Sequence, residues 1–231
     1  MRLKHQICTF VAILSTLIKV AAGNSPDMDM TFSNLSIKEG LSQSTILSSC
    51  QDDKGLMWFA THDGLNRYDG YEFTIYRNSA EDSTSIADNI IRKVHIDSKG
   101  RLWIGTDKGL SFYDSFSDSF RNFRTGGKGV TGIAEADGDK LLVAVGGSIK
   151  IFNMKSWKWD ISAPPCQPET FGARVLYRES DNIWIGTSSE GLFCYSIGSK
   201  DIKRISTFKS DKPINSILKR DGYLWIGTEG D

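Results

Sequence analysis

The chain has 231 residues, and its 28 lysines and arginines balance its 28 aspartates and glutamates, so the formal net charge is zero. This balance excludes the strongly basic surface that binds nucleic acid or an anionic membrane, and we expect no nucleic-acid partner. Aromatic residues make up 11% of the chain and helix-favouring runs are few, so the composition favours one domain of many short strands.

The first residues have the layout of a secretory leader. A positive start is followed by an apolar run over residues 7–18 and by small residues at 20–22. This run is short for a membrane span, and such an order of segments is typical of a signal peptide. We therefore expect residues 1–23 to be a signal peptide and residues 24–231 to be exported, with an uncleaved anchor as the alternative.

One phrase recurs along the rest of the chain at a nearly constant spacing. It consists of an apolar residue, tryptophan, another apolar residue, a small residue and threonine, and four copies carry the tryptophan: Trp58, Trp103, Trp184 and Trp225. A degenerate copy at residues 141–145 places Leu142 in the tryptophan slot, so the slots are 45, 39, 42 and 41 residues apart. Such periods are typical of four-stranded propeller blades or of helical pairs.

The second unit favours strands over helices. Residues 90–97, 101–106, 110–113 and 119–124 are short apolar or aromatic runs separated by turns rich in glycine and aspartate. Side chains of a strand alternate between two faces, whereas an amphipathic helix places apolar residues at every third or fourth position. No window of 11 residues shows this helical pattern. The sequence therefore predicts an all-β propeller of four-stranded blades.

The tryptophan and glycine of the phrase have structural roles in this interpretation. We expect the indoles to pack between neighbouring blades and Gly105, Gly186 and Gly227 to allow a close backbone approach. A sugar-stacking platform is the alternative for the indoles, but their occurrence once per blade favours packing. Flanking glycines are expected to supply the positive φ of hairpin turns: Gly55, Gly100 and Gly222 before the tryptophan strand, and Gly64, Gly109 and Gly191 after it.

The predicted blades follow one another along the chain. We expect five units, at residues 41–78, 86–125, 129–163, 174–210 and 213–231, of which the last has two of its four strands. Residues 30–36 alternate apolar and polar side chains, and we expect them to close the ring as the outermost strand of the final blade. Because half a blade leaves sheet edges unpaired, we also expect the chain to be the N-terminal part of a longer product.

Residues that could carry chemistry are few. Three cysteines follow the leader, Cys50, Cys166 and Cys194, and we expect buried free thiols, with a reactive or paired thiol more plausible at Cys166 in its proline-rich loop. His62 and His95 lie a blade apart, without a ligand motif beside them. We therefore expect no metal, no cofactor and no catalysis in this chain.

Three other polar segments have simple interpretations. Residues 52–55 and 137–139 are rich in aspartate but lack the ligand spacing of a calcium loop, so we expect ordinary turns. The glycine-rich segment 126–129 lacks the hydroxyl residue that follows a phosphate-binding loop, and we expect it to link two blades.

The richest cluster of polar and aromatic residues spans residues 63–71. Structurally, the cluster is two hairpin turns flanking a strand. As an alternative, His62, Asn66, Arg67 and Tyr71 are candidates to line one rim of the propeller and hydrogen-bond a sugar.

The same region carries a family likeness. Gly40-Leu41-Ser42-Gln43, followed by the run from Asp53 to Gly70, resembles the opening of the periplasmic sensor of hybrid two-component systems from gut Bacteroidetes. The later Leu-Trp-Ile-Gly-Thr phrases resemble the two-component regulator propeller repeat. The likeness covers nearly all of the chain after the leader, although the third unit departs from it at Leu142 and Val145.

This resemblance implies a periplasmic sensor of glycan fragments in a protein that is anchored to the inner membrane and carries a histidine kinase. The sequence after the leader contains no membrane helix and no kinase motif, so this chain can bind or pair but cannot phosphorylate. The implied partners are an oligosaccharide and a second copy of the chain, and the membrane is reached only through a missing C-terminal span or an uncleaved leader. The alternatives are a propeller-fold polysaccharide lyase or glycosidase, and a passive protein-interaction scaffold.

Overall fold

The computed structural model describes residues 32–160, 171–208 and 211–230. The expected signal peptide and Cys166 lie outside these residues. Contacts divide the chain into Met1–Asn34 and one compact unit, Leu35–Asp231, and the account below concerns this compact unit. It begins with a single 3₁₀ turn, η1 (Ile37–Glu39), which Ser36 and Glu39 cap by hydrogen-bonding to each other's ends.

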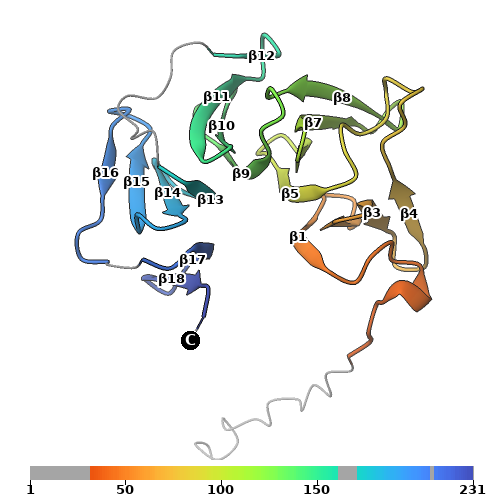
Figure 1. Cartoon of the computed structure of the whole chain (residues 1–231), viewed down its shortest axis with the longest axis horizontal. Coiled ribbons are helices and arrows are strands. Elements are labelled where there is room, and N and C mark those ends of the chain that lie inside the picture. The colour runs from red at the N-terminus through yellow and green to blue at the C-terminus, as the bar shows by residue number, and fades with distance from the viewer. Residues whose placement is uncertain (1–31, 161–170, 209–210, 231) are drawn as a thin grey trace, which may run out of the picture. The chain divides into compact units, whose positions relative to one another are not determined.

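After this turn the described residues form five antiparallel sheets (Figure 1). Sheet 1 contains β1 (Ile46–Gln51), β2 (Met57–Thr61), β3 (Gly64–Tyr68) and β4 (Phe73–Tyr76). Sheet 2 contains β5 (Ile91–Ile96), β6 (Leu102–Thr106), β7 (Gly109–Asp114) and β8 (Ser119–Arg124). Sheet 3 contains β9 (Val130–Glu135), β10 (Lys140–Val145), β11 (Ser148–Asn153) and β12 (Lys158–Trp159). Sheet 4 contains β13 (Ala173–Glu179), β14 (Asn182–Thr187), β15 (Leu192–Ser196) and β16 (Ile202–Arg204), and sheet 5 contains β17 (Ile214–Arg220) and β18 (Tyr223–Thr228).

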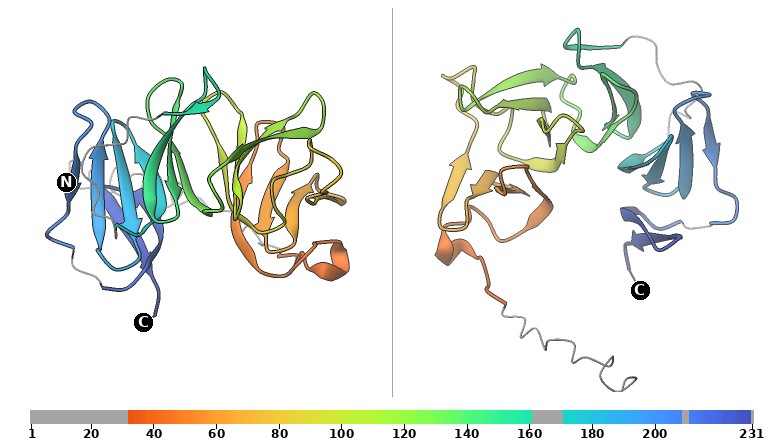
Figure 2. Two further views of the ribbon diagram at one scale, coloured as in Figure 1. Left: turned by 45° about the horizontal axis from the view of Figure 1, so that its top comes forward. Right: turned by 180° about the vertical axis from the view of Figure 1, so that it is seen from behind.

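Each strand pairs with the next one along the chain, and the sheets pack in chain order. The first strands contact one another from sheet to sheet, β1 with β5, β5 with β9, β9 with β13 and β13 with β17. They therefore lie on the inside of the row, whereas β4, β8, β12 and β16 lie on the outside (Figures 1 and 2). This arrangement confirms the predicted all-β propeller of four-stranded blades with a fifth, incomplete unit.

The hydrophobic core lies between the sheets. One cluster joins sheets 1 and 2, a second joins sheets 2 and 3, a third joins sheets 3 and 4, and a smaller one joins sheets 4 and 5. Each sheet therefore buries both faces only when it has a neighbour on each side, as expected for a repeat architecture in which units contact their neighbours alone.

The burial of the repeated tryptophan follows from this arrangement. Trp58 and Trp103 are 1% and 0% exposed, because a four-stranded sheet covers each of them. Trp184 is half-buried, since only the two strands of sheet 5 pack against it. Trp225 lies on sheet 5 itself and is 61% exposed. The indole slot is thus a packing position whose burial depends on the next sheet.

The small residue of the repeated phrase lets two sheets approach. A Cβ atom added to Gly105 would lie 2.7 Å from the carbonyl oxygen and from Cγ1 of Val130 in sheet 3, and one added to Gly186 would lie 2.5 Å from Cγ2 of Ile214 in sheet 5. Of the turn glycines, all but Gly109 have the predicted positive φ. Gly109 was predicted wrongly, because its φ is not positive and a Cβ there would instead meet the carbonyl oxygen of Phe123 at 2.5 Å.

Three of the repeated tryptophans donate a hydrogen bond from the indole N–H to an acidic side chain, which was not predicted from the sequence. Trp58 Nε1 donates to Asp52 at 2.9 Å, Trp103 Nε1 donates to Asp97 at 2.9 Å, and Trp184 Nε1 donates to Glu179 at 3.1 Å. Each acid stands in the turn or at the strand end that precedes its tryptophan strand, so one carboxylate joins the hairpin to the indole.

The degenerate third unit has neither the tryptophan nor its acidic acceptor. Leu142 is fully buried in the tryptophan slot, and Ala136 takes the place of the acid. Ala136 N bonds to Lys140 O just as Asp97 N bonds to Arg101 O, so the two positions are equivalent. A leucine needs no acceptor, and the acid is absent where the indole is absent.

The expected ring-closing strand is not found in its described part. Phe32–Ser36 form no strand, and Met30 and Thr31 lie outside the described residues. Over the described residues sheet 5 consists of β17 and β18, so an outermost strand would have no third strand to pair with there. The sheets otherwise fall within the expected segments, except that β13 begins at Ala173, one residue before the expected start.

Candidate functional site

The four rim candidates do not share a surface. Asn66 and Arg67 are neighbours on β3, and successive strand residues point to opposite faces of a sheet. His62 lies in the turn before β3 and Tyr71 in the turn after it, at opposite ends of the strand. The structure therefore does not bring the four residues to one rim.

Two of these residues have structural partners. Asn66 is 0% exposed; its Oδ1 accepts from Ser42 N at 2.9 Å, and its Nδ2 donates to Ser42 Oγ at 2.7 Å. Arg67 points towards sheet 2, where it donates to Tyr113 OH at 3.1 Å and lies 3.6 Å from Asp118. Asn66 therefore anchors the segment before β1, and Arg67 joins two sheets.

A pair of variants tests the structural role of Asn66 by comparing it with the exposed candidate Tyr71. Replacing Asn66 with alanine is expected to lower the free energy of unfolding by about 1–3 kcal/mol, because Ser42 loses a buried partner. Replacing Tyr71, which is 93% exposed, is expected to change it by less than about 0.5 kcal/mol. Urea denaturation measures both, and an unchanged stability of Asn66→Ala would contradict the structural role.

A pocket of about 930 Å³ offers a better candidate. Its walls come from the loop between β4 and β5, from Lys108 in the β6–β7 turn, and from the end of β8 with Gly126 and Gly127 after it. From the sequence, this glycine-rich segment is expected only to link two blades. Sequence alone could not show that it meets the loop between β4 and β5.

Hydrogen bonds shape the β4–β5 loop. Asn78 Nδ2 donates to Ile86 O at 2.7 Å, and Ser85 Oγ donates to Asp82 O at 2.7 Å. The loop is also fastened to sheet 2, because Asn122 Nδ2 donates to Ser85 O at 2.8 Å and Phe120 N donates to Thr84 O at 2.7 Å. A loop fixed in this way presents a preformed surface, as binding loops on rigid scaffolds do.

The pocket lining combines several chemical types. The lining contains serine hydroxyls, asparagine amides, the carboxylates of Glu81 and Asp82, and the apolar surfaces of Ala80, Ala87 and Phe123. Lys108 pairs with Asp88 at 2.9 Å, whereas Arg124 is exposed and has no side-chain partner among the described residues. Such a lining can hydrogen-bond hydroxyl groups and contact the apolar faces of a sugar ring.

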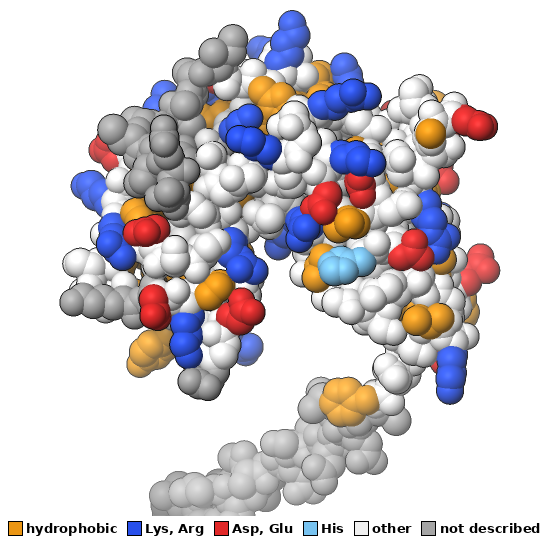
Figure 3. All heavy atoms as spheres, viewed as in Figure 1, with side chains coloured by type: hydrophobic (Ala, Val, Ile, Leu, Met, Phe, Trp, Pro, Cys, Tyr) orange, Lys and Arg blue, Asp and Glu red, His pale blue; other side chains and the backbone are white. Residues whose placement is uncertain are grey.

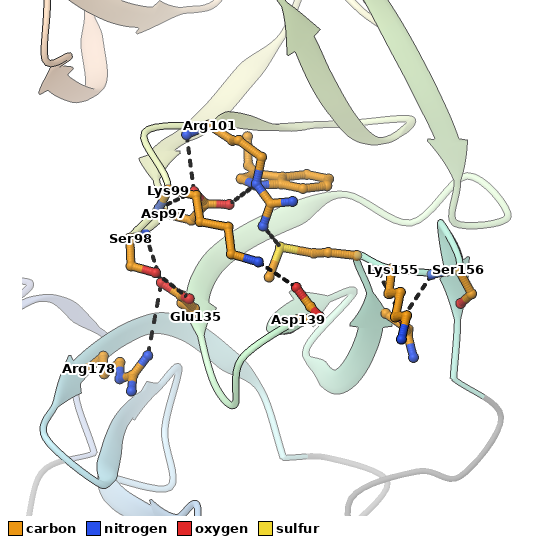
Figure 4. A network of polar contacts seen from close by, with 12 residues as sticks. Asp97, Ser98, Lys99, Arg101, Glu135, Asp139, Lys155, Ser156 and Arg178 are labelled. Carbon is orange, nitrogen blue, oxygen red and sulfur yellow. Dashed lines mark hydrogen bonds and ion pairs between the residues drawn. The ribbon is translucent and has the colours of Figure 1, made fainter.

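The opposite ends of the strands carry a charged network that joins sheets 2, 3 and 4 (Figure 4). Glu135 at the end of β9 accepts from Ser98 N at 2.8 Å and from Ser98 Oγ at 2.7 Å, and Arg178 of β13 approaches it at 4.0 Å. Lys99 Nζ contacts Asp139 at 2.7 Å. Because the acidic and basic side chains of this network pair with one another, we infer that this end of the propeller has a structural role and links the sheets.

Burial governs the thiols and one histidine of the described residues. Cys50 and Cys194 are free and half-buried, and burial raises the pKa of the Cys50 thiol to about 12. His95 is held neutral because burial lowers its pKa to about 4. In the described segments, no three His, Cys, Asp or Glu side chains gather closely enough to hold a metal ion.

Comparison with known proteins identifies the repeats. Residues 40–63, 85–108 and 209–230 match the family model described as "two component regulator propeller". These three segments thus match the repeat of that family, which confirms the resemblance seen in the sequence over these residues.

Three individual proteins are similar to this chain. A histidine kinase P4 from Formosa agariphila is 39% identical over 83 residues, which are 36% of this chain and 6% of that protein. The extracellular domain of a putative hybrid two-component system from B. thetaiotaomicron superimposes with a TM-score of 0.69 at 27% identity, over 85% of this chain and 29% of that domain. A second such domain, from a putative one-component system of B. thetaiotaomicron, gives a TM-score of 0.64 at 21% identity, over 80% and 29%.

The chain therefore spans less than a third of each of these proteins. The two solved structures named above are extracellular domains of putative signalling systems. Over the ranges that the structure describes, no helix has the length and apolar character needed to cross a membrane.

Proposed function

We propose that this chain is an extracytoplasmic sensing module that binds a glycan fragment and relays its occupancy to a histidine kinase. The observation that supports it most is the pocket between the β4–β5 loop and sheet 2, which is preformed by hydrogen bonds. Its lining holds hydroxyls, amides and apolar surfaces together with two carboxylates, Glu81 and Asp82, and two cations, Lys108 and Arg124. The likeness to extracellular domains of two-component systems supports a sensing role.

The proposal includes a compartment and a route for the signal. The module lies in the periplasm after cleavage of residues 1–23, and the protein of which it is part is anchored to the inner membrane. Ligand binding changes the pairing of two copies, and this change reaches the kinase. Sedimentation of the purified protein with and without ligand tests the last step, since an unchanged oligomeric state would contradict relay by pairing.

Binding is tested with an oligosaccharide panel in a thermal-shift screen, followed by calorimetry of each hit. A ligand at 100 times its Kd stabilises the folded state by about 2.7 kcal/mol, which is expected to raise the Tm by several degrees. Chromatography of the incubated sugars should show intact ligand. Cleaved product would instead favour a lyase or glycosidase, and the absence of any shift across the panel would contradict glycan sensing.

The site is tested with two matched arginine variants. Replacing Arg124 with alanine removes a charged donor from the pocket and is expected to weaken binding about 10- to 100-fold. Arg204 is also exposed at the end of an outer strand, β16, but does not line the pocket, so Arg204→Ala is expected to bind as the wild type does. Equal affinities for both variants would place the ligand elsewhere.

A further inference from the structure

The first strands of the sheets carry a charge that the chain as a whole does not. β1, β5, β9, β13 and β17 together hold six lysines and arginines against two glutamates, a net charge of +4, whereas the whole chain is neutral. These strands line the inside of the row (Figure 1). Figure 3 shows lysine and arginine side chains at the edge of the hollow that the row encloses.

A bulge recurs at the same position of every first strand. In each sheet one residue of the first strand is skipped in the pairing with the second strand. The skipped residues are Leu47, Arg92, Thr131, Arg174 and Asn215. A bulge leaves its extra residue unpaired and re-aims its side chain.

Burial indicates that these side chains turn away from the core. The residues just before the bulges in the last four sheets, Ile91, Val130, Ala173 and Ile214, are at most 2% exposed, whereas every bulge residue is half-buried or exposed. The innermost strands thus present five equivalent side chains at one level of the hollow, two of them arginines.

The five bulge residues are called the inner ring below, and one further cation lies next to it in the sequence. Lys93 follows the bulge residue of β5 and pairs across the sheet with Gly105. The equivalent residues of the other sheets carry no charge: Ser48, Gly132, Val175 and Ser216. The repeat therefore does not require a lysine at this position.

These cations differ in their partners. Arg92 is held by Asp107, with Nη2 3.0 Å from Oδ2, and a second contact through Nε fixes its guanidinium. Lys93 and Arg174 are half-buried, and neither side chain has a hydrogen bond or ion pair within the described ranges. Burial lowers the pKa of Lys93, and the nearby Cys50 thiol offsets part of this effect.

The glutamates of the inner strands cannot compensate these cations, because they already have partners. Glu135 binds Ser98 and Arg178, and Glu179 binds Lys219 and the indole of Trp184. A half-buried cation without a partner is costly, and a bound anion would supply the missing charge.

We propose that Lys93 and Arg174, with Arg92 and Asn215 of the inner ring, bind the carboxylate or sulfate groups of an acidic oligosaccharide. This inference rests on the proposed glycan sensing and names its ligand class. The fixed guanidinium of Arg92 keeps free N–H groups for the ligand, and the Asn215 amide supplies a neutral donor. The Thr131 hydroxyl already donates to Ala173 O at 3.4 Å.

The test measures binding to the full chain by calorimetry at low salt. The probes are a tetrauronate, its carboxyl-reduced neutral counterpart, and a sulfated tetrasaccharide. The acidic probes are expected to bind at least about 10-fold more tightly than the neutral one, because each charged hydrogen bond contributes about 10-fold or more. The two acidic probes distinguish carboxylate from sulfate as the recognised group.

Variants assign the effect to these residues. The double variant Lys93→Gln/Arg174→Gln is expected to lose about 100-fold or more in affinity for the acidic probe, whereas Lys93→Arg, which keeps the charge, retains most of it. The matched control Lys150→Gln/Lys203→Gln removes two exposed lysines from β11 and β16 and is expected to bind normally. If the double variant does not fold, Arg174→Gln alone carries the test with an expected loss of about 10-fold.

The outcomes separate this inference from the proposed function. Binding of the neutral counterpart as tight as that of the tetrauronate, or unchanged affinity in the double variant, overturns the proposed anion-binding ring and leaves glycan sensing standing. Failure of every oligosaccharide in the panel overturns both.

Discussion

Replacing Trp103 with alanine is expected to lower the free energy of unfolding by about 3–5 kcal/mol. The indole is 0% exposed and is surrounded by Phe112, Phe152 and Trp157, whose ring centroids lie 5.2, 5.5 and 5.8 Å from its own. Alanine leaves a cavity between sheets 2 and 3 that these rings cannot fill without strain. Urea denaturation followed by circular dichroism measures the effect.

The matched control is another tryptophan in the same slot of the repeat. Trp225 is 61% exposed on sheet 5, so Trp225→Ala is expected to cost less than about 1 kcal/mol. If the indoles instead formed a platform for sugar stacking, the exposed Trp225 would matter for ligand binding and the buried Trp103 would not, since only exposed indoles can stack on a ligand. Similar stabilities of the two variants would contradict the view that the slot is a packing position.

Replacing Asp97 with alanine is expected to cost about 3–5 kcal/mol as well, because it breaks a buried charge pair. The side chain of Asp97 is 0% exposed and contacts Arg101 Nε at 2.7 Å. It also accepts from Trp103 Nε1 at 2.9 Å and from the backbone N–H groups of Lys99 and Arg101 at 3.0 Å each. The variant leaves these donors without an acceptor.

Asp137→Ala is the control for this variant, because Asp137 is an exposed residue in the corresponding turn of sheet 3. Its change in the free energy of unfolding is expected to stay within about 0.5 kcal/mol. A loss as large as that of Asp97→Ala would mean that turn chemistry, rather than the joint between carboxylate and indole, explains the stability.

The effect of Asp97 is also expected to depend on pH. Burial alone would raise the pKa of Asp97, but the hydrogen bonds from Trp103 and Arg101 hold it below its usual value. A group whose pKa is lowered by folding stabilises the protein above its unfolded pKa of about 3.9, and this contribution is lost as the pH falls through the folded pKa. The stabilities of wild type and Asp97→Ala should therefore converge in acid and stay apart at neutral pH.

The fold could be predicted from the spacing of one phrase. The period indicated the units, and the short alternating runs favoured strands over helices. The degenerate copy was found because Leu142 stands where the period places it, although it is not a tryptophan. These inferences hold because each unit must bury the same two faces against its neighbours.

The hydrogen-bonded pairs of carboxylate and tryptophan follow a spacing that is visible in the sequence, although they were not predicted. Asp52 and Asp97 each stand six residues before the tryptophan of their unit, and the unit that lacks the tryptophan has Ala136 at that position. Comparing the units side by side would have revealed this joint loss. The shorter spacing from Glu179 to Trp184 hides the pattern in the fourth unit.

The candidate site could not be predicted in the same way. The rim candidates were chosen because they are close in sequence, but Asn66 and Arg67 face opposite sides of β3, which separates them in space. The pocket joins residues that are distant in sequence, and the inner ring depends on bulges. A bulge is a feature of the pairing between two strands, so no residue pattern on one strand reveals it.

The central functional claim is that a glycan binds to the pocket face and the inner strands of the propeller. Hydrogen–deuterium exchange of the protein with and without saturating oligosaccharide tests it most directly. The account predicts slower exchange in residues 77–90 and 126–129 and in the first halves of β5 and β13. Protection confined to the outer strands β12 and β16, or to sheet 5 around Trp225, would contradict it.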